Sequence, residues 1–162
     1  MGIREKLSEK PVASICIATL VLVGAVAYTI RSAMPSDAYT KGYFTTDDGQ
    51  SLFTESMDQL APFDHHGSPA YRAWVFSCDG GKTTFVAYLE RCTPKGLGRL
   101  KPLQADFQAG KSRLAPSPNP DELEVKKPGS GNPWVNRSNA LEAQKITNVQ
   151  CPNGGTPELQ FP

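Results

Sequence analysis

The sequence predicts a mainly β protein of the α+β class. It should have an N-terminal transmembrane helix, then a small antiparallel β-hairpin domain with one or two short helices and a Pro/Gly-rich irregular segment. Residues 11–30 carry no charge, two later stretches place aromatic and β-branched residues around Asp-Gly turns, and proline and glycine become frequent after residue 93. The expected boundaries are 1–10 for a cytoplasmic N-terminal segment, 11–31 for the transmembrane helix, 36–93 for the β-hairpin core, 94–132 for the irregular segment and 133–162 for a C-terminal helix and tail packed on the core.

The apolar segment 11–30 is dominated by Val, Ile, Leu and Ala and lies between Lys10 and Arg31. About 20 residues rising 1.5 Å each cover the roughly 30 Å hydrocarbon core of a bilayer. A cleaved signal peptide is the alternative, but it has an apolar core of about 7–15 residues followed by a small-residue cleavage site. Here the A-x-A triplet that begins at Ala25 lies inside the apolar run, so a retained anchor is favoured.

Flanking charge predicts the orientation of this anchor. Arg4, Lys6 and Lys10 precede it, whereas Arg31 and Lys41 follow it. Lys and Arg near a membrane span are more frequent on the cytoplasmic side, which favours a cytoplasmic N-terminus and an extracytoplasmic domain. The expected partners are therefore the lipid bilayer and another membrane or envelope protein.

The net charge argues against nucleic acid as a partner. The 162 residues carry a formal charge of +1, and four of the 17 basic and two of the 16 acidic residues precede residue 32. The remainder therefore carries about −1. A near-neutral domain lacks the basic surface that binds phosphate backbones.

Two turns share one pattern. Thr45–Phe53 and Ser77–Phe85 both fit S/T-x-D-x-G-x-S/T, with an aromatic residue two positions later. They resemble the Asp-box hairpin of sialidases and other β-rich proteins, although both copies lack the usual Trp after the last hydroxyl residue. An Asp side chain can accept hydrogen bonds from turn amides, and glycine supplies a positive φ. The predicted structural turn residues are Asp47, Gly49, Asp79 and Gly81. Two copies are too few for a propeller.

The cysteines allow a disulfide outside the apolar segment. Cys16 lies within that segment, while Cys78, Cys92 and Cys151 follow it. In an ideal hairpin Cys78 faces about Thr83, which leaves Cys92 beyond the roughly 7 Å bridging limit. The preferred pair is therefore Cys78–Cys151 with Cys92 free, and three reduced thiols are the alternative.

A metal site is the second alternative use of these residues. Zinc favours four ligands from Cys and His. The candidate ligands are Cys78, Cys92, Cys151, His65 and His66. Their assembly requires separate loops to converge, so we expect a solvated loop at residues 60–69 and no cofactor.

The C-terminal half gives weaker signals. Thr93-Pro94 can open a short helix, whereas residues 115–131 are expected to form a loop without a packed core. Ser138 or Asn139 can cap a helix that runs through Thr147. The expected apolar contacts of the C-terminal region are Trp134, Leu141, Ile146, Leu159 and Phe161.

The layout as a whole resembles a known group of proteins. The segments that carry the resemblance are Tyr43–Gly49, Pro62–Asp64, Phe76–Lys82, Tyr88–Arg91 and the Cys151-Pro152 tail, in a chain with one apolar span. They are similar to small bacterial single-pass membrane proteins with an extracytoplasmic β-rich domain. The resemblance implies a location in the bacterial inner (cytoplasmic) membrane, and it brings no activity with it.

Catalytic signatures are missing from the sequence. It contains no G-x-S-x-G, P-loop, H-E-x-x-H or C-x-x-C motif. We therefore expect a non-enzymatic, membrane-anchored envelope protein that binds or helps assemble another envelope component. A metal- or thiol-dependent site at the cysteines and histidines is the alternative, and carbohydrate binding, suggested by the Asp-box likeness, is a weaker one.

Overall fold

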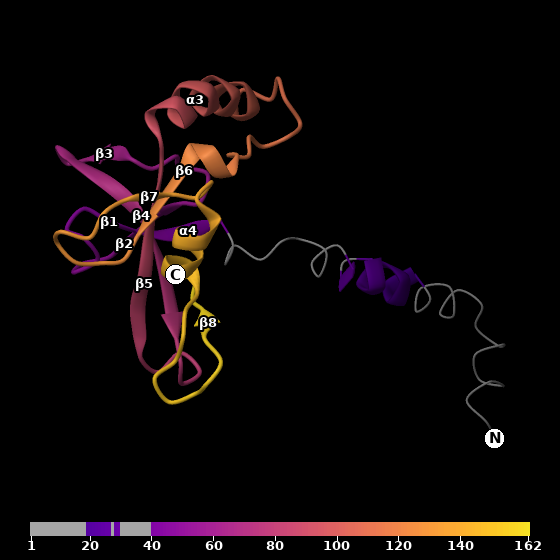
Figure 1. The fold of residues 1–162 in the computed structure, drawn as a ribbon. Coiled ribbons are helices and arrows are strands. Elements are labelled where there is room, and N and C mark those ends of the chain that lie inside the picture. The colour runs from indigo at the N-terminus through magenta and orange to yellow at the C-terminus, as the bar shows by residue number, and fades with distance from the viewer. Residues whose placement is uncertain (1–18, 27, 30–39) are drawn as a thin grey trace, which may run out of the picture. The chain divides into compact units, whose positions relative to one another are not determined.

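The computed structural model describes residues 19–26, 28–29 and 40–162, and the chain divides into the units Met1–Ser36 and Asp37–Pro162 (Figure 1). In the first unit, residues 19–26 and 28–29 are helical. Their large apolar side chains are exposed: Leu20, Val21, Leu22, Val23, Val26 and Tyr28.

The predicted transmembrane helix falls only partly on residues that the structure describes. A search of those residues finds no helix with the length and apolar character needed to cross a bilayer. Positions 11–18, 27, 30 and 31 of the predicted span lie outside the described residues, as do the predicted segment 1–10 and Cys16.

The second unit is built on an antiparallel sheet with helices, which confirms the α+β class. Eight strands form the sheet in the order β2-β1-β4-β5-β6-β7, and β3 and β8 both pair with β4. The strands are β1 (Lys41–Thr45), β2 (Phe53–Ser56), β3 (Phe63–His65), β4 (Ser68–Ser77), β5 (Thr84–Cys92), β6 (Leu123–Lys126), β7 (Val135–Asn136) and β8 (Glu158–Leu159). The helices are α3 (Pro94–Gln108), the 3-10 turn η2 (Pro120–Glu122) and α4 (Ala140–Thr147).

The β4–β5 hairpin is the centre of this unit, as the alternating bulky residues predicted. Ala73 and Leu89 are register partners on the two strands, and with Val75 they form a buried core cluster. Tyr43, Val86 and Trp134 pack against that cluster. The prediction that Trp134 covers part of the core is therefore confirmed.

One edge of β4 is covered by three different strands in succession. Residues 68–70 pair with β3, residues 71–73 with β1, and residues 76–77 with β8. The prediction of a loop at residues 60–69 was wrong for Phe63–His65, which form the strand β3. His66 and Gly67 have φ values of 53° and 84°, so they reverse the chain tightly enough for β3 to pair with the start of β4.

The segment 94–132 was expected to be irregular apart from a short helix opened by Thr93-Pro94; the start of that helix is confirmed, and the prediction of an irregular remainder was wrong. The segment contains the 15-residue helix α3, followed by η2 and β6. Thr93 caps α3, since its Oγ1 accepts a hydrogen bond of 3.0 Å from the Gly96 amide, and Pro94 occupies the first turn. Leu100, on the inner side of α3, is fully buried against Cys92 and Leu123.

The strand β6 was not predicted from the sequence, because the residues around it are rich in proline. Leu123 and Val125 alternate with charged residues and are buried, while the strand pairs with the second half of β5. The prediction of a loop at residues 115–131 was therefore wrong for the residues that form η2 and β6. Figure 1 shows α3 and the start of β6 at one end of the sheet, with the β4–β5 turn and β8 at the other.

The C-terminal region follows the prediction with one exception. The helix α4 has Asn139 as its N-terminal cap residue and ends at Thr147. Its buried residue is Ala143, whereas Leu141 is 75% exposed, so the predicted packing of Leu141 was wrong. β8 then pairs with the end of β4, where Leu159 lies opposite Phe76.

Candidate binding cavity beside the central hairpin

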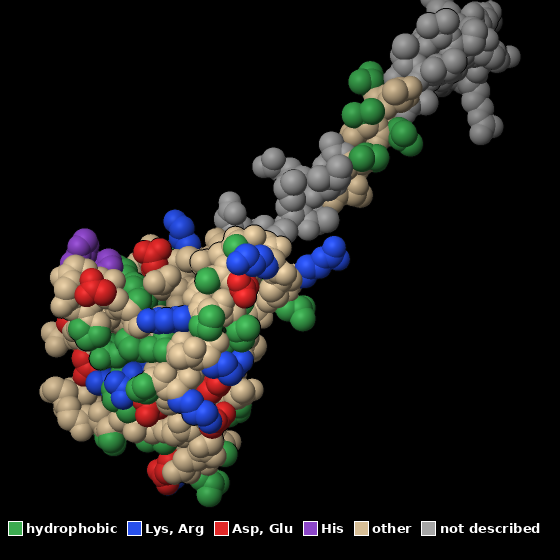
Figure 2. All heavy atoms as spheres, turned by 90° about the horizontal axis from the view of Figure 1, so that it is seen from above, with side chains coloured by type: hydrophobic (Ala, Val, Ile, Leu, Met, Phe, Trp, Pro, Cys, Tyr) green, Lys and Arg blue, Asp and Glu red, His purple; other side chains and the backbone are tan. Residues whose placement is uncertain are grey.

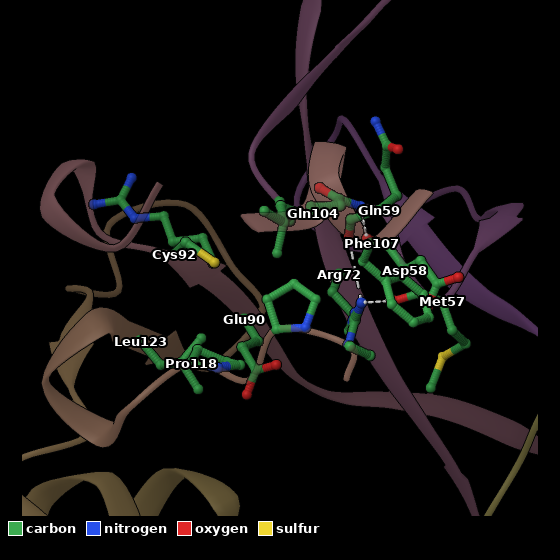
Figure 3. Close-up of a pocket in the computed structure, with 15 residues that line it drawn as sticks. Met57, Asp58, Gln59, Arg72, Glu90, Cys92, Gln104, Phe107, Pro118 and Leu123 are labelled. Atoms are coloured by element: carbon green, nitrogen blue, oxygen red, sulfur yellow. Dashed lines mark hydrogen bonds between the residues drawn. The ribbon is translucent and has the colours of Figure 1, made fainter. Parts of the chain in front are cut away.

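A small cavity opens between the central hairpin, α3 and two connecting segments (Figure 3). Its volume is about 130 Å³, and residues 57–61 and the segment after α3 contribute to its wall. The lining includes the charged residues Asp58, Arg72, Glu90 and Arg91, the polar residue Gln104 and the apolar residues Cys92, Phe107 and Pro118. Acidic and basic residues therefore share the cavity wall with apolar ones, and Arg91 is paired with Glu124 at 2.7 Å.

Arg72 and Glu90 reach the cavity because the hairpin register brings them together. They are register partners on β4 and β5, so they lie on neighbouring strands at the same level of the sheet. They nevertheless form no direct ion pair: among the described residues, the carboxylate of Glu90 pairs with Arg137, at 3.1 Å.

Arg72 is held by neutral acceptors. Its guanidinium donates hydrogen bonds to the backbone carbonyls of Met57 and of Gln59, the latter at 3.3 Å, and Figure 3 marks these bonds. The same group lies 5.7 Å from the centre of the Phe44 ring. In the described part of the chain no carboxylate lies within 4.0 Å of Arg72. Arg72 therefore braces the loop after β2 while its charge has no contacting counter-charge.

Glu90 is a poorly hydrated carboxylate. The residue is only 7% exposed, and burial raises the pKa of its carboxyl group against the opposing effects of Arg72 and Arg137. Removal from water disfavours the charged form, and in this case it outweighs two neighbouring cations.

Cys92 is an unreactive thiol. It is free and buried. Burial, followed by the charge of Glu90, raises the pKa of its thiol to about 11. The thiolate is the nucleophilic form of cysteine, so Cys92 is protonated and weakly nucleophilic at neutral pH.

The other two cysteines of the domain form a disulfide. Cys78 and Cys151 are joined with a Cα–Cα distance of 5.7 Å across a sequence separation of 73 residues. The bond ties the segment after α4 to the end of the β4–β5 hairpin. It is the pair that the ideal hairpin register favoured.

The candidate metal site is not assembled. Cys78 and Cys151 have no free thiols for a metal, and the described residues contain no group of three or more His, Cys, Asp or Glu side chains placed to hold an ion. His65 stacks on Phe53 with ring centres 3.8 Å apart, and His66 contacts His65 at 4.4 Å. Figure 2 shows the two histidines together at one edge of the domain, on a face where acidic and basic side chains are interspersed. The metal alternative was therefore wrong for this set.

The first Asp-box turn is closed by its own side chains. Thr45 donates its hydroxyl hydrogen to Asp47 at 2.8 Å and accepts the Gly49 amide at 2.9 Å. Asp47 also accepts the amide of Ser51 at 2.9 Å and its hydroxyl group. These bonds lower the pKa of the Asp47 carboxyl to about 2, chiefly through Ser51.

The second turn repeats this arrangement. Ser77 donates to Asp79 at 2.7 Å and accepts the Gly81 amide at 2.8 Å. Asp79 accepts the Thr83 amide at 2.9 Å, and hydrogen bonds from Thr83 lower the pKa of the Asp79 carboxyl to about 2. Gly49 and Gly81 have φ values of 90° and 86°. All four predicted turn residues thus have the same geometry in both copies, and the two carboxylates are used within their own turns.

We expect Asp79→Asn to lower the thermal unfolding midpoint at pH 7, because a charged acceptor of turn amides is lost. The pKa lies near 2 in the folded chain and at 3.8 ordinarily, so the carboxylate stabilises the fold above pH 4. This contribution is lost as the pH falls through about 2. The difference between wild type and variant should therefore be largest at neutral pH and narrow between pH 4 and pH 2.

Asp58→Asn is the matched control for this measurement. In the described chain the Asp58 carboxylate makes no hydrogen bond or ion pair with another side chain, so its replacement should leave the midpoint at pH 7 nearly unchanged. A gap between wild type and the Asp79 variant that stays constant from pH 7 to pH 2 would contradict the assignment.

The first turn has a further contact that the sequence did not suggest. Asp48 pairs with Lys126 at 2.5 Å and accepts the Gly129 amide at 2.9 Å, which joins the turn to the end of β6. Lys126 also lies 5.4 Å from the ring centre of Trp134. These contacts depend on β6, which the sequence did not reveal.

The cavity residues were also missed, although a signal for two of them existed. Arg72 is the one charged residue of β4, Glu90 follows the apolar residues of β5 and precedes Arg91, and an antiparallel hairpin places Arg72 and Glu90 opposite each other. Phe107 and Pro118 gave no such signal, because they reach the cavity only through the fold of α3 and the segment after it.

The chain matches no protein-family model, no curated protein and no solved structure. What the cavity can do therefore follows from its own residues. Carboxylate and guanidinium side chains beside an apolar wall can bind a small group. The nearest thiol is protonated at neutral pH, and Glu90 is engaged by Arg137.

Proposed function

We propose that this chain is a non-enzymatic, single-pass envelope protein of the bacterial inner membrane, with its N-terminus in the cytoplasm. Its β-rich domain lies outside the cytoplasm and binds or helps assemble another envelope component. The observation that carries the proposal is the Cys78–Cys151 disulfide. Disulfides persist in oxidising compartments and are rare in the cytosol.

The anchor is supported by composition and exposure. Residues 11–30 contain no charged side chain, and the part of this segment that the structure describes exposes Leu, Val and Tyr side chains. A helix that is apolar all round is stable in lipid, where its side chains are solvated by acyl chains. The basic residues before the segment favour the proposed orientation.

A binding role is supported by the cavity. It is small, and Arg72 and Glu90 on its wall also brace the fold. Catalysis by Cys92 would require a thiolate, and its raised pKa of about 11 opposes ionisation. The cavity therefore favours recognition over a thiol-dependent reaction.

The location can be tested with the full chain in a bacterium that has a periplasm. We expect the protein to stay with the membrane after carbonate extraction and its domain to be digested when protease is added to intact spheroplasts. Non-reduced peptide mapping after thiol blocking should recover the Cys78 and Cys151 peptides joined. Release by carbonate, protection of the domain in intact spheroplasts, or alkylation of both cysteines would overturn the proposal.

Binding can be tested with a photo-crosslinking residue at Gln59, on the cavity wall, and a matched one at Lys82, in the exposed β4–β5 turn. We expect a discrete adduct with one envelope protein from position 59 that is not formed from position 82. Equal labelling from both positions, or no adduct from position 59, would contradict binding at this face.

A further inference from the structure

We infer that the cavity binds a small zwitterion, with a free α-amino acid as its ligand class: the ligand carboxylate lies at Arg72 and the ligand ammonium at Glu90. This assignment goes beyond the proposed function, in which the domain binds another envelope component. It does not depend on the membrane anchor or on the identity of a protein partner.

The arrangement of charge carries the inference. Arg72 and Glu90 line the same cavity from neighbouring strands, yet each is held by other groups. Arg72 is bonded to backbone carbonyls, and Glu90 is bonded to Arg137. The cavity wall thus presents a guanidinium and a carboxylate that do not pair with each other, alongside Asp58 and Arg91, the latter paired with Glu124.

A ligand with one charge fits this wall poorly. A simple anion near Arg72 would meet the Glu90 carboxylate, and a simple cation near Glu90 would meet the Arg72 guanidinium. Like charges brought together in a binding site cost affinity. A zwitterion satisfies both sites at once, and its ammonium returns hydrogen bonds to a carboxylate that is removed from water.

The size and the remaining wall set the ligand class. A volume of about 130 Å³ is close to that of cavities that admit one benzene molecule, roughly six non-hydrogen atoms. Alanine and serine are of this size. Phe107 and Pro118 supply apolar surface for a short side chain, while Gln104 and residues 57–61 contribute to the rest of the wall.

The test is calorimetric titration of the purified full chain in detergent with glycine, L-alanine and L-serine. Two matched derivatives remove one charge each: N-acetyl-L-alanine lacks the ammonium, and L-alanine amide lacks the carboxylate. We expect the free amino acids to bind and each derivative to bind about tenfold to a hundredfold more weakly, as for the loss of one charged hydrogen-bonding group. Absence of binding by all three amino acids, or equal binding of the derivatives, would overturn the inference.

Variants separate the two charged sites. Glu90→Gln should reduce alanine binding and remove the preference for alanine over its N-acetyl derivative. Glu142→Gln is the control, since Glu142 pairs with Lys145 on the surface of α4 and should leave binding unchanged. Arg72 also braces the loop after β2, so its substitution can disturb the fold.

A variant that fills the cavity tests the site without substituting Arg72. Ala115 is exposed and lies on the cavity wall, so Ala115→Trp should fill the cavity without altering either charge. We expect this variant to lose alanine binding with an unchanged unfolding midpoint, and retained binding would contradict the assignment. A chain that passes the location and crosslinking tests but binds no amino acid would disprove this inference alone.

Discussion

Replacing Cys78 and Cys151 together by serine is expected to lower the free energy of unfolding by about 4 kcal/mol. The bond closes a loop across 73 residues of sequence, which removes conformational freedom from the unfolded chain. Loops of about 15 and 100 residues correspond to roughly 3 and 4.7 kcal/mol in the chain-entropy account. Since small domains are stable by about 5–15 kcal/mol, this loss is large.

The structure also limits what else can hold this tail. β8 pairs with β4 through two residues, Glu158 and Leu159, and both are exposed. The Gln160 amide adds one hydrogen bond of 2.9 Å to the Val75 carbonyl, and the Tyr43 hydroxyl donates one of 3.4 Å to the Phe161 carbonyl. Without the covalent link, we expect the C-terminal segment to separate from the hairpin before the rest of the sheet unfolds.

The measurement is urea unfolding of the full chain in detergent, with and without a thiol reductant. Wild type in reductant should match the double variant, and the double variant should not respond to reductant. Cys92→Ala, which leaves the disulfide in place, should remain sensitive to reductant. Equal unfolding midpoints for wild type and the double variant would show that the disulfide does not stabilise the domain.

The central hairpin and its turns could be predicted because their signals are local. Alternation along β4 and β5 and the Asp-Gly turns depend on residues within a few positions of each other. The cysteine pairing could be narrowed for the same reason, because the hairpin register places Cys78 far from Cys92. The tail partner Cys151 was then the remaining choice.

The start of α3 was predicted from Thr93-Pro94, but its full length and the rest of this end of the domain could not be predicted, because their residues favour irregular structure when considered alone. α3 contains Gly96, Gly98 and Pro102, which disfavour helix in isolation. The helix is supported by contacts distant in sequence: Leu100 packs on Leu123, and Arg99 forms two hydrogen bonds with the Glu122 carboxylate. Neither contact has a signature in the local sequence.

The cavity depends on α3 and the segment after it. Its outer wall is formed by α3 and the segment after it, so a linker at these positions would have left Arg72 and Glu90 on an open sheet. Their pairing across the hairpin was predictable, whereas their enclosure was not. A charged residue on a central strand becomes a candidate site only when something covers it.

Two glycine substitutions in α3 test how this helix packs on the rest of the domain. We expect Gly98→Ala to stabilise the protein by about 0.5–1 kcal/mol, because glycine inside a helix costs this much relative to alanine. A methyl group at Gly98 would have no heavy atom within 4 Å. Gly96→Ala should instead destabilise by about 1–3 kcal/mol, the usual cost of forcing an extra methyl group into a packed site.

The difference arises from one close approach. A Cβ atom at Gly96 would lie 2.8 Å from the backbone oxygen of Glu122 and 2.8 Å from its Cβ. That oxygen cannot move freely, since it accepts the Thr93 amide at 2.8 Å. The added methyl group must therefore push α3 away from η2, which weakens the Arg99–Glu122 contact as well.

Urea unfolding of the two variants should give shifts of opposite sign, and a stabilised Gly96→Ala protein would mean that α3 does not pack on η2. Because α3 also forms the cavity wall, the Gly96 variant should lose ligand affinity in step with stability, whereas the Gly98 variant should keep it.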